Sequence, residues 1–193
     1  MVVPSKFVRA LPPTVGACFK QWAAFLYDSV PFLMPDSKLH SYAHTERVLL
    51  HALLIGSTEA DAEPRTLTIL AHAAVFHDTR RTEEGKETGH GARAAEFYEE
   101  FCRSHPELTF LPEAACIMRW HDRHDQHGEE DIARLFPDSA AYVTQLYKIF
   151  KDADALDRWR LGRRGLNPDF LRTDKATHLS DFARTLVMLT SQG

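Results

Sequence analysis

The chain has 193 residues, of which 44% are hydrophobic and 26% are charged. These values are ordinary for a globular protein and exclude a disordered, collagen-like or disulfide-scaffold chain. The formal net charge of -4 argues against general binding to nucleic acid. No segment approaches the roughly 18 unbroken apolar residues of a membrane helix, so we expect no membrane association.

The cysteines and the N-terminal segment bear on the compartment. Cys18, Cys102 and Cys116 lie far apart and form no CxxC pair, which favours a reducing environment. The first 22 residues contain no continuous apolar stretch of the kind found in a secretion signal. We therefore expect a cytoplasmic protein.

Apolar residues recur at helical spacing through the first half of the chain. This spacing predicts helices over residues 16–30, from Ser37 or Ser41 to Gly56, and from Pro64 to about His77. The polar segment 78–91 contains three glycines and is predicted to be a loop.

The second half of the chain continues the helical pattern. It predicts helices over residues 92–103, 112–120 and 139–159, and a last helix from near Ser180. The polar segments 122–131 and 161–173 are predicted to be irregular. Because no alternating run is long enough for a strand, the sequence predicts an all-α fold, with residues 1–193 in a single domain.

Side chains that bind metals occur in separate segments of this pattern. The donors are His44, the pair His77-Asp78, His121 and Asp154, with His90 as a further candidate. Imidazole and carboxylate ligands together suit Mn, Fe, Co, Ni or Mg better than a thiolate-bound structural zinc. Two ligands of each kind would leave two positions of an octahedral metal for water and substrate, as a hydrolase requires.

Three short sequences carry a resemblance to a known family. HTERV contains His44, AHAAVFHD ends in His77-Asp78, and ADALDRWR contains Asp154. In this order they resemble the H…HD…D pattern of the HD superfamily. The resemblance implies a helical bundle with its core at about residues 37–160 and one helix added at each end. It also implies a metal-dependent phosphohydrolase that acts on a nucleotide or another small phosphoester, with His44, His77, Asp78 and Asp154 as metal ligands.

Three aspartates compete for the place of the last ligand. The family's Ala-Asp-x-Leu pattern selects Asp154 over Asp152 and Asp157. Asp157 is expected either to support a ligand from behind or to pair with Arg158 or Arg160 at the surface.

The number of metals stays open at this point. In HD proteins with two metals, further histidines lie after the His-Asp loop and at the end of the next helix. GHGARAAEF, with His90, and IMRWH, with His121, resemble these segments. The two histidines are expected either to bind a second metal, with Asp78 as a bridge, or to line the cavity near water and substrate.

Two arginines and two acid-base groups are candidates for contact with a small phosphorylated substrate. Arg80 and Arg81 follow the His-Asp pair directly, and guanidinium groups bind phosphate oxygens in a two-point fashion. Asp78 or His121 could accept a proton from the attacking water, and His121 could also contact substrate. His40, four residues before His44, is expected either to line the site or to begin the helix.

Two other functions remain open from the sequence. Some HD proteins hold two irons with six such ligands and oxidise C–H bonds with oxygen, and this chain has a comparable set of donors. The other alternative is a non-catalytic HD module that senses a ligand. The complete set of metal-binding motifs argues against this last alternative.

Overall fold

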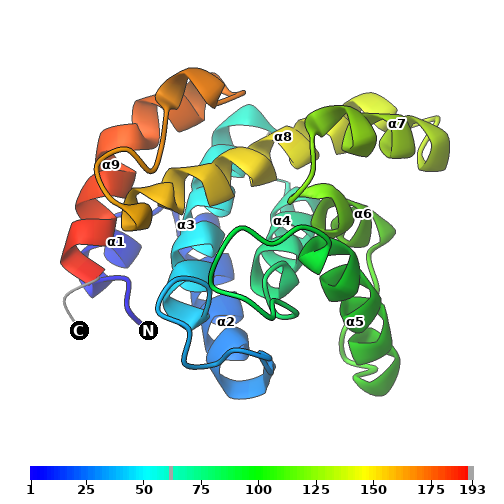
Figure 1. The fold of residues 1–193 in the computed structure, drawn as a ribbon, viewed down its shortest axis with the longest axis horizontal. Coiled ribbons are helices and arrows are strands. Elements are labelled where there is room, and N and C mark those ends of the chain that lie inside the picture. The colour runs from blue at the N-terminus through cyan, green and yellow to red at the C-terminus, as the bar shows by residue number, and fades with distance from the viewer. Residues whose placement is uncertain (61–62, 191–193) are drawn as a thin grey trace.

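The structure is a computed structural model that describes residues 1–60 and 63–190. These residues form helices and connecting segments without any strand, so the predicted all-α class is confirmed. The α-helices, shown in Figure 1, are α1 (Ser5–Arg9), α2 (Pro13–Ser29), α3 (Tyr42–Glu59), α4 (Pro64–Phe76), α5 (His90–Ser104), α6 (Pro112–Trp120), α7 (Asp125–Leu135), α8 (Ala140–Leu156) and α9 (Asp174–Thr190). Two short 3-10 helices, η1 (Asp157–Leu161) and η2 (Pro168–Phe170), lie between α8 and α9. None of the described helices is both long and apolar enough to cross a membrane.

Helix α3 lies at the centre of the fold, in contact with α2, α4, α8 and α9 (Figure 1). Twelve of its 18 residues are buried, and so are ten of the 13 residues of α4. Helices buried on most sides belong to the core, unlike surface helices with a single apolar stripe. Polar side chains on α3 and α4 therefore lie in buried surroundings, where each needs a hydrogen-bonding partner.

Helices α5 and α6 form a closely packed pair beside α4. Gly91, in the first turn of α5, allows this approach, because a Cβ atom there would collide with the carbonyl oxygen of Met118 and lie 2.9 Å from Nδ1 of His121. Gly89, just before α5, has a φ of 93°, a left-handed conformation that favours glycine. The two glycines let the chain turn sharply into α5 and bring His90 close to α6.

The prediction of a loop over residues 122–131 is wrong, because α7 begins at Asp125 within this segment. Only Gly128 and Ile132 of α7 are buried, so the helix has almost no apolar stripe from which a period could be recognised. Its outer face is stabilised by polar pairs, such as the hydrogen bond of 2.7 Å between Gln126 and Glu130.

Some helix boundaries also differ from the prediction. The last helix begins at Asp174, six residues before Ser180, because Asp152 anchors the preceding turn by accepting hydrogen bonds from the backbone and side chain of Thr173. The predicted helix over 139–159 changes to the 3-10 helix η1 after Leu156. The short α1 was not predicted, and α2 begins three residues before Gly16.

Replacement of two helical glycines tests the packing of α7 against α8. In Gly128→Ala the new methyl group would lie 2.5 Å from the ring of the fully buried Tyr147, whose hydroxyl donates to the carbonyl of Trp120. We expect a loss of about 1–3 kcal/mol in the free energy of unfolding, measured by urea denaturation. Gly16→Ala is the control, since its methyl group has ordinary contacts at 3.6 Å and should stabilise α2 by about 0.5–1 kcal/mol. Equal changes in the two variants would contradict this packing.

Candidate metal centre

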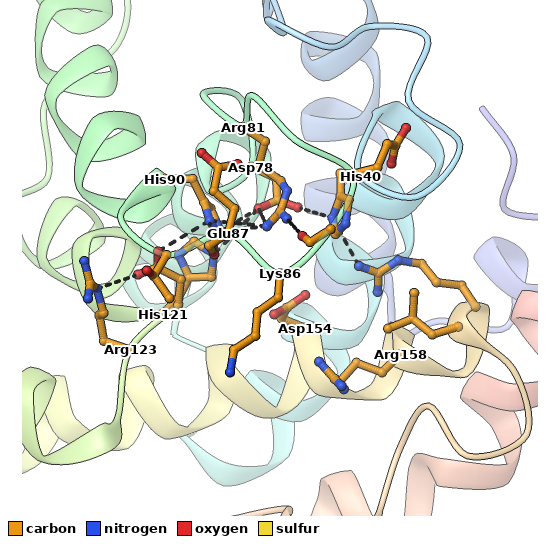
Figure 2. Close-up of a pocket in the computed structure, with 16 residues that line it drawn as sticks. His40, Asp78, Arg81, Lys86, Glu87, His90, His121, Arg123, Asp154 and Arg158 are labelled. Atoms are coloured by element: carbon orange, nitrogen blue, oxygen red, sulfur yellow. Dashed lines mark hydrogen bonds and ion pairs between the residues drawn. The ribbon is translucent and has the colours of Figure 1, made fainter.

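The candidate ligands lie at or near the ends of five helices that meet at one place. Figure 2 shows four of them, Asp78, His90, His121 and Asp154. His44 is in the first turn of α3, His77 and Asp78 follow α4, His90 begins α5, His121 follows α6, and Asp154 is in the last turn of α8. A side chain at a helix end can be directed inward more freely than one confined to a helix face. The structure thus brings all six predicted donors together.

The first group of donors surrounds His44. Its Nε2 atom lies 3.1 Å from Nε2 of His77 and 3.4 Å from both Asp78 Oδ2 and Asp154 Oδ1. His77 Nε2 is 3.7 Å from Asp78 Oδ2. Ligands at right angles around a metal with bonds of about 2.1 Å are about 3.0 Å apart, and tetrahedral ligands at similar bond lengths are about 3.4 Å apart. The observed spacing therefore fits adjacent ligands of one divalent metal.

A second group of donors lies on the other side of Asp78. His90 Nε2 is 2.9 Å from His121 Nε2, and these atoms lie 3.1 Å and 3.7 Å from Asp78 Oδ1. Oδ1 of Asp78 thus faces these two imidazoles, whereas Oδ2 faces the first group. This is the arrangement expected of a carboxylate that bridges two cations.

The hydrogen bonds of His77 and His121 define which nitrogen of each ring carries the proton. Nδ1 of His77 lies 2.7 Å from the carbonyl oxygen of Ala74, and Nδ1 of His121 lies 2.7 Å from that of Met118. A carbonyl oxygen can only accept a hydrogen bond, so each Nδ1 donates its proton to the last turn of the preceding helix. In the neutral rings, Nε2 is therefore left with a free lone pair.

His44 has the same tautomer for a different reason. Its Nδ1 lies 2.7 Å from Oδ2 of Asp157, which also accepts from Nε and Nη2 of Arg47 at 2.6 Å and 3.0 Å through its two oxygens. Burial alone would raise the pKa of Asp157, but His44 and Arg47 lower it well below the usual range. Asp157 is fully buried and supports His44 from behind, which was one of its two expected roles.

The facing pairs of Nε2 atoms form positions that could hold a cation. In the pair His44–His77 both Nδ1 atoms donate elsewhere, so two lone pairs face each other at 3.1 Å with no hydrogen between them. In His90, Nδ1 lies 3.1 Å from the carbonyl oxygen of Glu87, which leaves its Nε2 facing that of His121 in the same way. Such contacts repel unless a proton or a metal ion lies between them, and metal-bound histidines are held by this kind of hydrogen bond to the second nitrogen.

The charges at the centre favour metal binding at neutral pH. Burial lowers the pKa of His77 to about 3, despite the nearby Asp78, so that His77 is neutral. Burial would raise the pKa values of Asp78 and Asp154, but the surrounding histidines outweigh it and lower both, and Arg160 adds to this effect at Asp154. Neutral imidazole and ionised carboxylate are the forms that bind metals. The described residues can therefore hold a metal ion.

A cavity of about 620 Å³ opens in front of the centre (Figure 2). Asp78, His90, His121 and Asp154 line it, whereas His44 and His77 lie behind them. The cavity is lined by five cationic side chains, which are Arg81, Lys86, Arg123, Arg158 and Arg160. Five carboxylates also line it, of which Asp78 and Asp154 belong to the donor cluster and the others are Glu84, Glu87 and Asp122. A ligand in the cavity would thus touch the exposed side of the donor cluster and would have cationic side chains within the surrounding wall.

Arg80 and Arg81 have different surroundings. Arg81 lines the cavity, and its Nη1 lies 3.2 Å from both ring nitrogens of His90. The guanidinium of Arg80 instead stacks 3.3 Å from the centre of the Phe97 ring and donates to the carbonyl of Pro31. Within the described residues Arg80 is not part of the cavity wall, and its expected contact with substrate is wrong for this structure because this stacking turns it away.

The structure separates Asp152 from Asp154 and adds a further aspartate, Asp122, to the surroundings of the centre. Asp152 is turned away from the centre and accepts hydrogen bonds from Arg172 and Thr173, so Asp154 is the aspartate of this helix that faces His44. Asp122 was missed in the sequence. Its side chain is only 3% exposed, accepts from the backbone of Gly89 and lies 3.4 Å from Nδ1 of His90. Its position next to His121 is the one signal that could have drawn attention to it.

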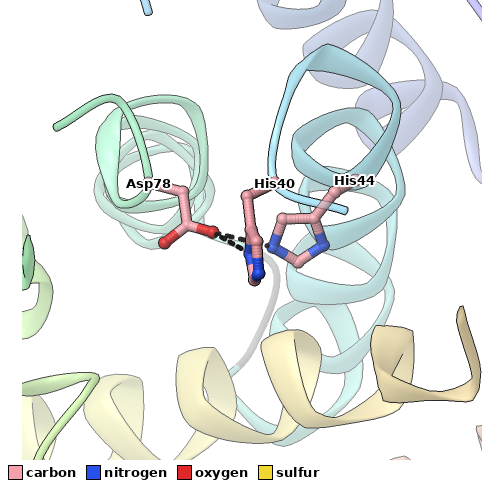
Figure 3. A group of neighbouring side chains, drawn as sticks. All are labelled: His40, His44 and Asp78. Atoms are coloured by element: carbon pink, nitrogen blue, oxygen red, sulfur yellow. Dashed lines mark hydrogen bonds and ion pairs between the residues drawn. The ribbon is translucent and has the colours of Figure 1, made fainter. Parts of the chain in front are cut away.

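His40 lies in the cavity wall, which was one of its two expected positions. Its Nδ1 atom is 3.0 Å from Asp78 Oδ2 (Figure 3). The same atom is 3.3 Å from Nη2 of Arg160. Ser41, not His40, is the residue that precedes the first turn of α3. His40 therefore adds a fifth imidazole to the surroundings of Asp78.

Comparisons of the chain with protein-family models, with curated proteins and with solved structures found no match.

Replacement of Asp157 tests whether it orients a metal ligand. Asp157→Asn offers an amide where His44 needs an acceptor, and we expect the affinity for Mn²⁺, measured by calorimetric titration, to fall by about 10–100-fold. Asp152→Asn is the matched control, because Asp152 is equally buried but binds Arg172 and Thr173 instead of a histidine. It should lower stability and leave the affinity unchanged. The same affinity in wild type and Asp157→Asn would exclude the orienting role.

Proposed function

We propose that this chain is a metal-dependent phosphohydrolase of the HD superfamily. The metal ligands in this proposal are His44, His77, Asp78 and Asp154 at one position, and His90, His121 and Asp78 at a second. The observation that carries the proposal is the pair of facing Nε2 atoms of His44 and His77, 3.1 Å apart, behind a cationic cavity. The proposed HD core at 37–160 contains α3 to α8, with α1, α2 and α9 added outside it.

The chain's own residues supply charge and position in the proposed reaction. A divalent metal, when bound, lowers the pKa of its water and polarises a phosphoryl oxygen. Arg81, whose Nη1 lies 3.8 Å from Asp78 Oδ1, offers a guanidinium to the phosphoryl oxygens at the edge of the donor cluster. Arg80 has no place in the proposed substrate contacts, since it stacks on Phe97.

Asp78 and His121 differ as acceptors of the water's proton. Burial lowers the pKa of His121, but its contacts with Asp78 outweigh burial and raise it. Burial would raise the pKa of Asp78, but the surrounding histidines outweigh burial and lower it well below its usual value. These histidines are His77, His121, His40 and His44. An imidazole with a raised pKa accepts a proton more readily than a carboxylate with a lowered pKa. In the proposal Asp78 therefore serves as a metal ligand. His121 would accept the proton on Nε2 when the second metal position is empty, because its Nδ1 donates to Met118.

The second candidate is a di-iron oxygenase of the HD type. It is favoured by one observation, the convergence of all six donors into two groups that share Asp78. The cationic cavity supports hydrolysis of a phosphoester more directly, because C–H oxidation needs no concentration of positive charge. A non-catalytic sensing module remains the outcome if the protein binds metal and ligand without turnover.

Activity assays with two histidine variants test the proposed function. Wild-type protein with added Mn²⁺ should hydrolyse a phosphomonoester, and excess chelator should stop the reaction. His77→Gln should lower the rate by about 100-fold or more, because a metal donor is lost. His72→Gln is the matched control on the same helix, since His72 is also buried but binds the hydroxyl of Tyr98 outside the centre. Equal activity in both variants, with folding checked by circular dichroism, would contradict the proposal.

Metal analysis tests the number of metals. We expect two equivalents of metal per chain in the wild type and one in His90→Ala or His121→Ala, because each variant loses a donor of the second group. His124→Ala is the control, because His124 lies three residues after His121 in the chain and outside the cavity wall. One equivalent in all four proteins would reject the second position. Two irons with consumption of oxygen would support the oxygenase instead.

A further inference from the structure

The cavity wall has an unusual composition for a site that would hold a nucleotide. Among its 16 described lining residues, five carry a positive charge, Leu161 is the sole large apolar side chain, and none is Phe, Tyr or Trp. Proteins commonly bind nucleobases by stacking them on aromatic or apolar surfaces. Nothing comparable is present here, so the wall favours a ligand whose surface is mostly charged.

Four of the five cations fall into two sets, and the fifth, Arg123, lies 3.8 Å from the carboxylate of Asp122. Arg81 and Arg160 lie near the donor cluster, are each only 7% exposed, and donate to backbone carbonyls such as those of Gly85 and Leu39. Lys86 and Arg158 are exposed and come from facing walls, the loop before α5 and the helix η1 (Figure 2). In the described structure no carboxylate pairs with either of these two, and Arg158 donates through Nε alone, to the carbonyl of Gly165. Their charged ends are therefore free to bind a ligand.

Two acidic side chains of the outer wall have partners outside these cations. Glu87 accepts from Thr82 and is neutralised by Arg93, which lies outside the cavity wall. Glu84 accepts a hydrogen bond of 2.9 Å from the neutral hydroxyl of Ser37 and keeps its negative charge. The two cations Lys86 and Arg158 therefore outnumber the one carboxylate of the outer wall that has no cationic partner, Glu84.

We propose that the substrate carries a second anionic group, a carboxylate or a second phosphate, and lacks an aromatic base. The phosphoester would lie at the donor cluster beside Arg81, and the second anion would bind Lys86 and Arg158. A volume of about 620 Å³ is ample for such a small phosphorylated acid or bisphosphate. This inference rests on the proposed function and narrows its substrate class.

Matched substrates test the inference. With Mn²⁺ present, kcat/KM should be at least about tenfold higher for 3-phosphoglycerate than for glycerol 3-phosphate, because a charge-assisted contact is gained. Propane-1,3-diol bisphosphate, compared with propyl phosphate, tests a phosphate as the second anion, and 5′-AMP tests an aromatic base. The preference for 3-phosphoglycerate should fall about tenfold in Arg158→Gln and in Lys86→Gln. It should stay at the wild-type ratio in Arg164→Gln, since Arg164 is exposed and lies outside the cavity wall.

Two results would overturn the inference and leave the proposed function standing. One is equal hydrolysis of each substrate that has two anionic groups and of its partner that has only the phosphate, and the other is a clear preference for 5′-AMP. If no phosphoester is hydrolysed, the proposed function fails, and calorimetric binding of 3-phosphoglycerate and glycerol 3-phosphate still decides the inference. Tighter binding of 3-phosphoglycerate that weakens in Arg158→Gln would support it, and equal binding would reject it.

Discussion

The candidate metal centre depends on one buried carboxylate, Asp78, whose Oδ2 faces three imidazoles and whose Oδ1 faces two. A lone carboxylate at 4% exposure would be costly, and the histidines around it make its ionised form favourable. Two of these histidines, His44 and His77, repel each other, because their Nε2 lone pairs face each other. A divalent cation would balance the charge of Asp78 and would remove the repulsion between the two lone pairs. The stability of this part of the core would then depend on the binding of that cation.

Hydrogen bonds to the second ring nitrogen fix the orientation of the histidines at the helix ends. His77 and His121 each follow a helix and donate Nδ1 to a carbonyl three residues earlier, so the helix fixes both the tautomer and the direction of the ring. His44 lies within a helix and has no such carbonyl, and Asp157 takes that role while Arg47 balances its charge. The buried pair of Arg47 and Asp157 therefore serves the position of His44 and connects α3 to η1.

The sequence predicted most of the helices and the six donors, because buried helices leave a clear apolar period and metal donors are chemically distinctive. It failed where those signals are weak. Helix α7 buries too few residues to show a period. The inward position of Asp122 depends on the backbone of Gly89, a contact between segments far apart in the chain. Arg80 and Arg81 are neighbours of the same chemical type, and packing against Phe97 alone separates them.

The most direct test of the account is a crystal structure grown with Mn²⁺, with diffraction data collected on both sides of the manganese absorption edge. The account predicts an anomalous peak bonded to Nε2 of His44 and His77 and to carboxylate oxygens of Asp78 and Asp154, at about 2.0–2.3 Å. A peak ligated through Nδ1, or no peak between His44 and His77 in a protein that binds Mn²⁺ in solution, would contradict it.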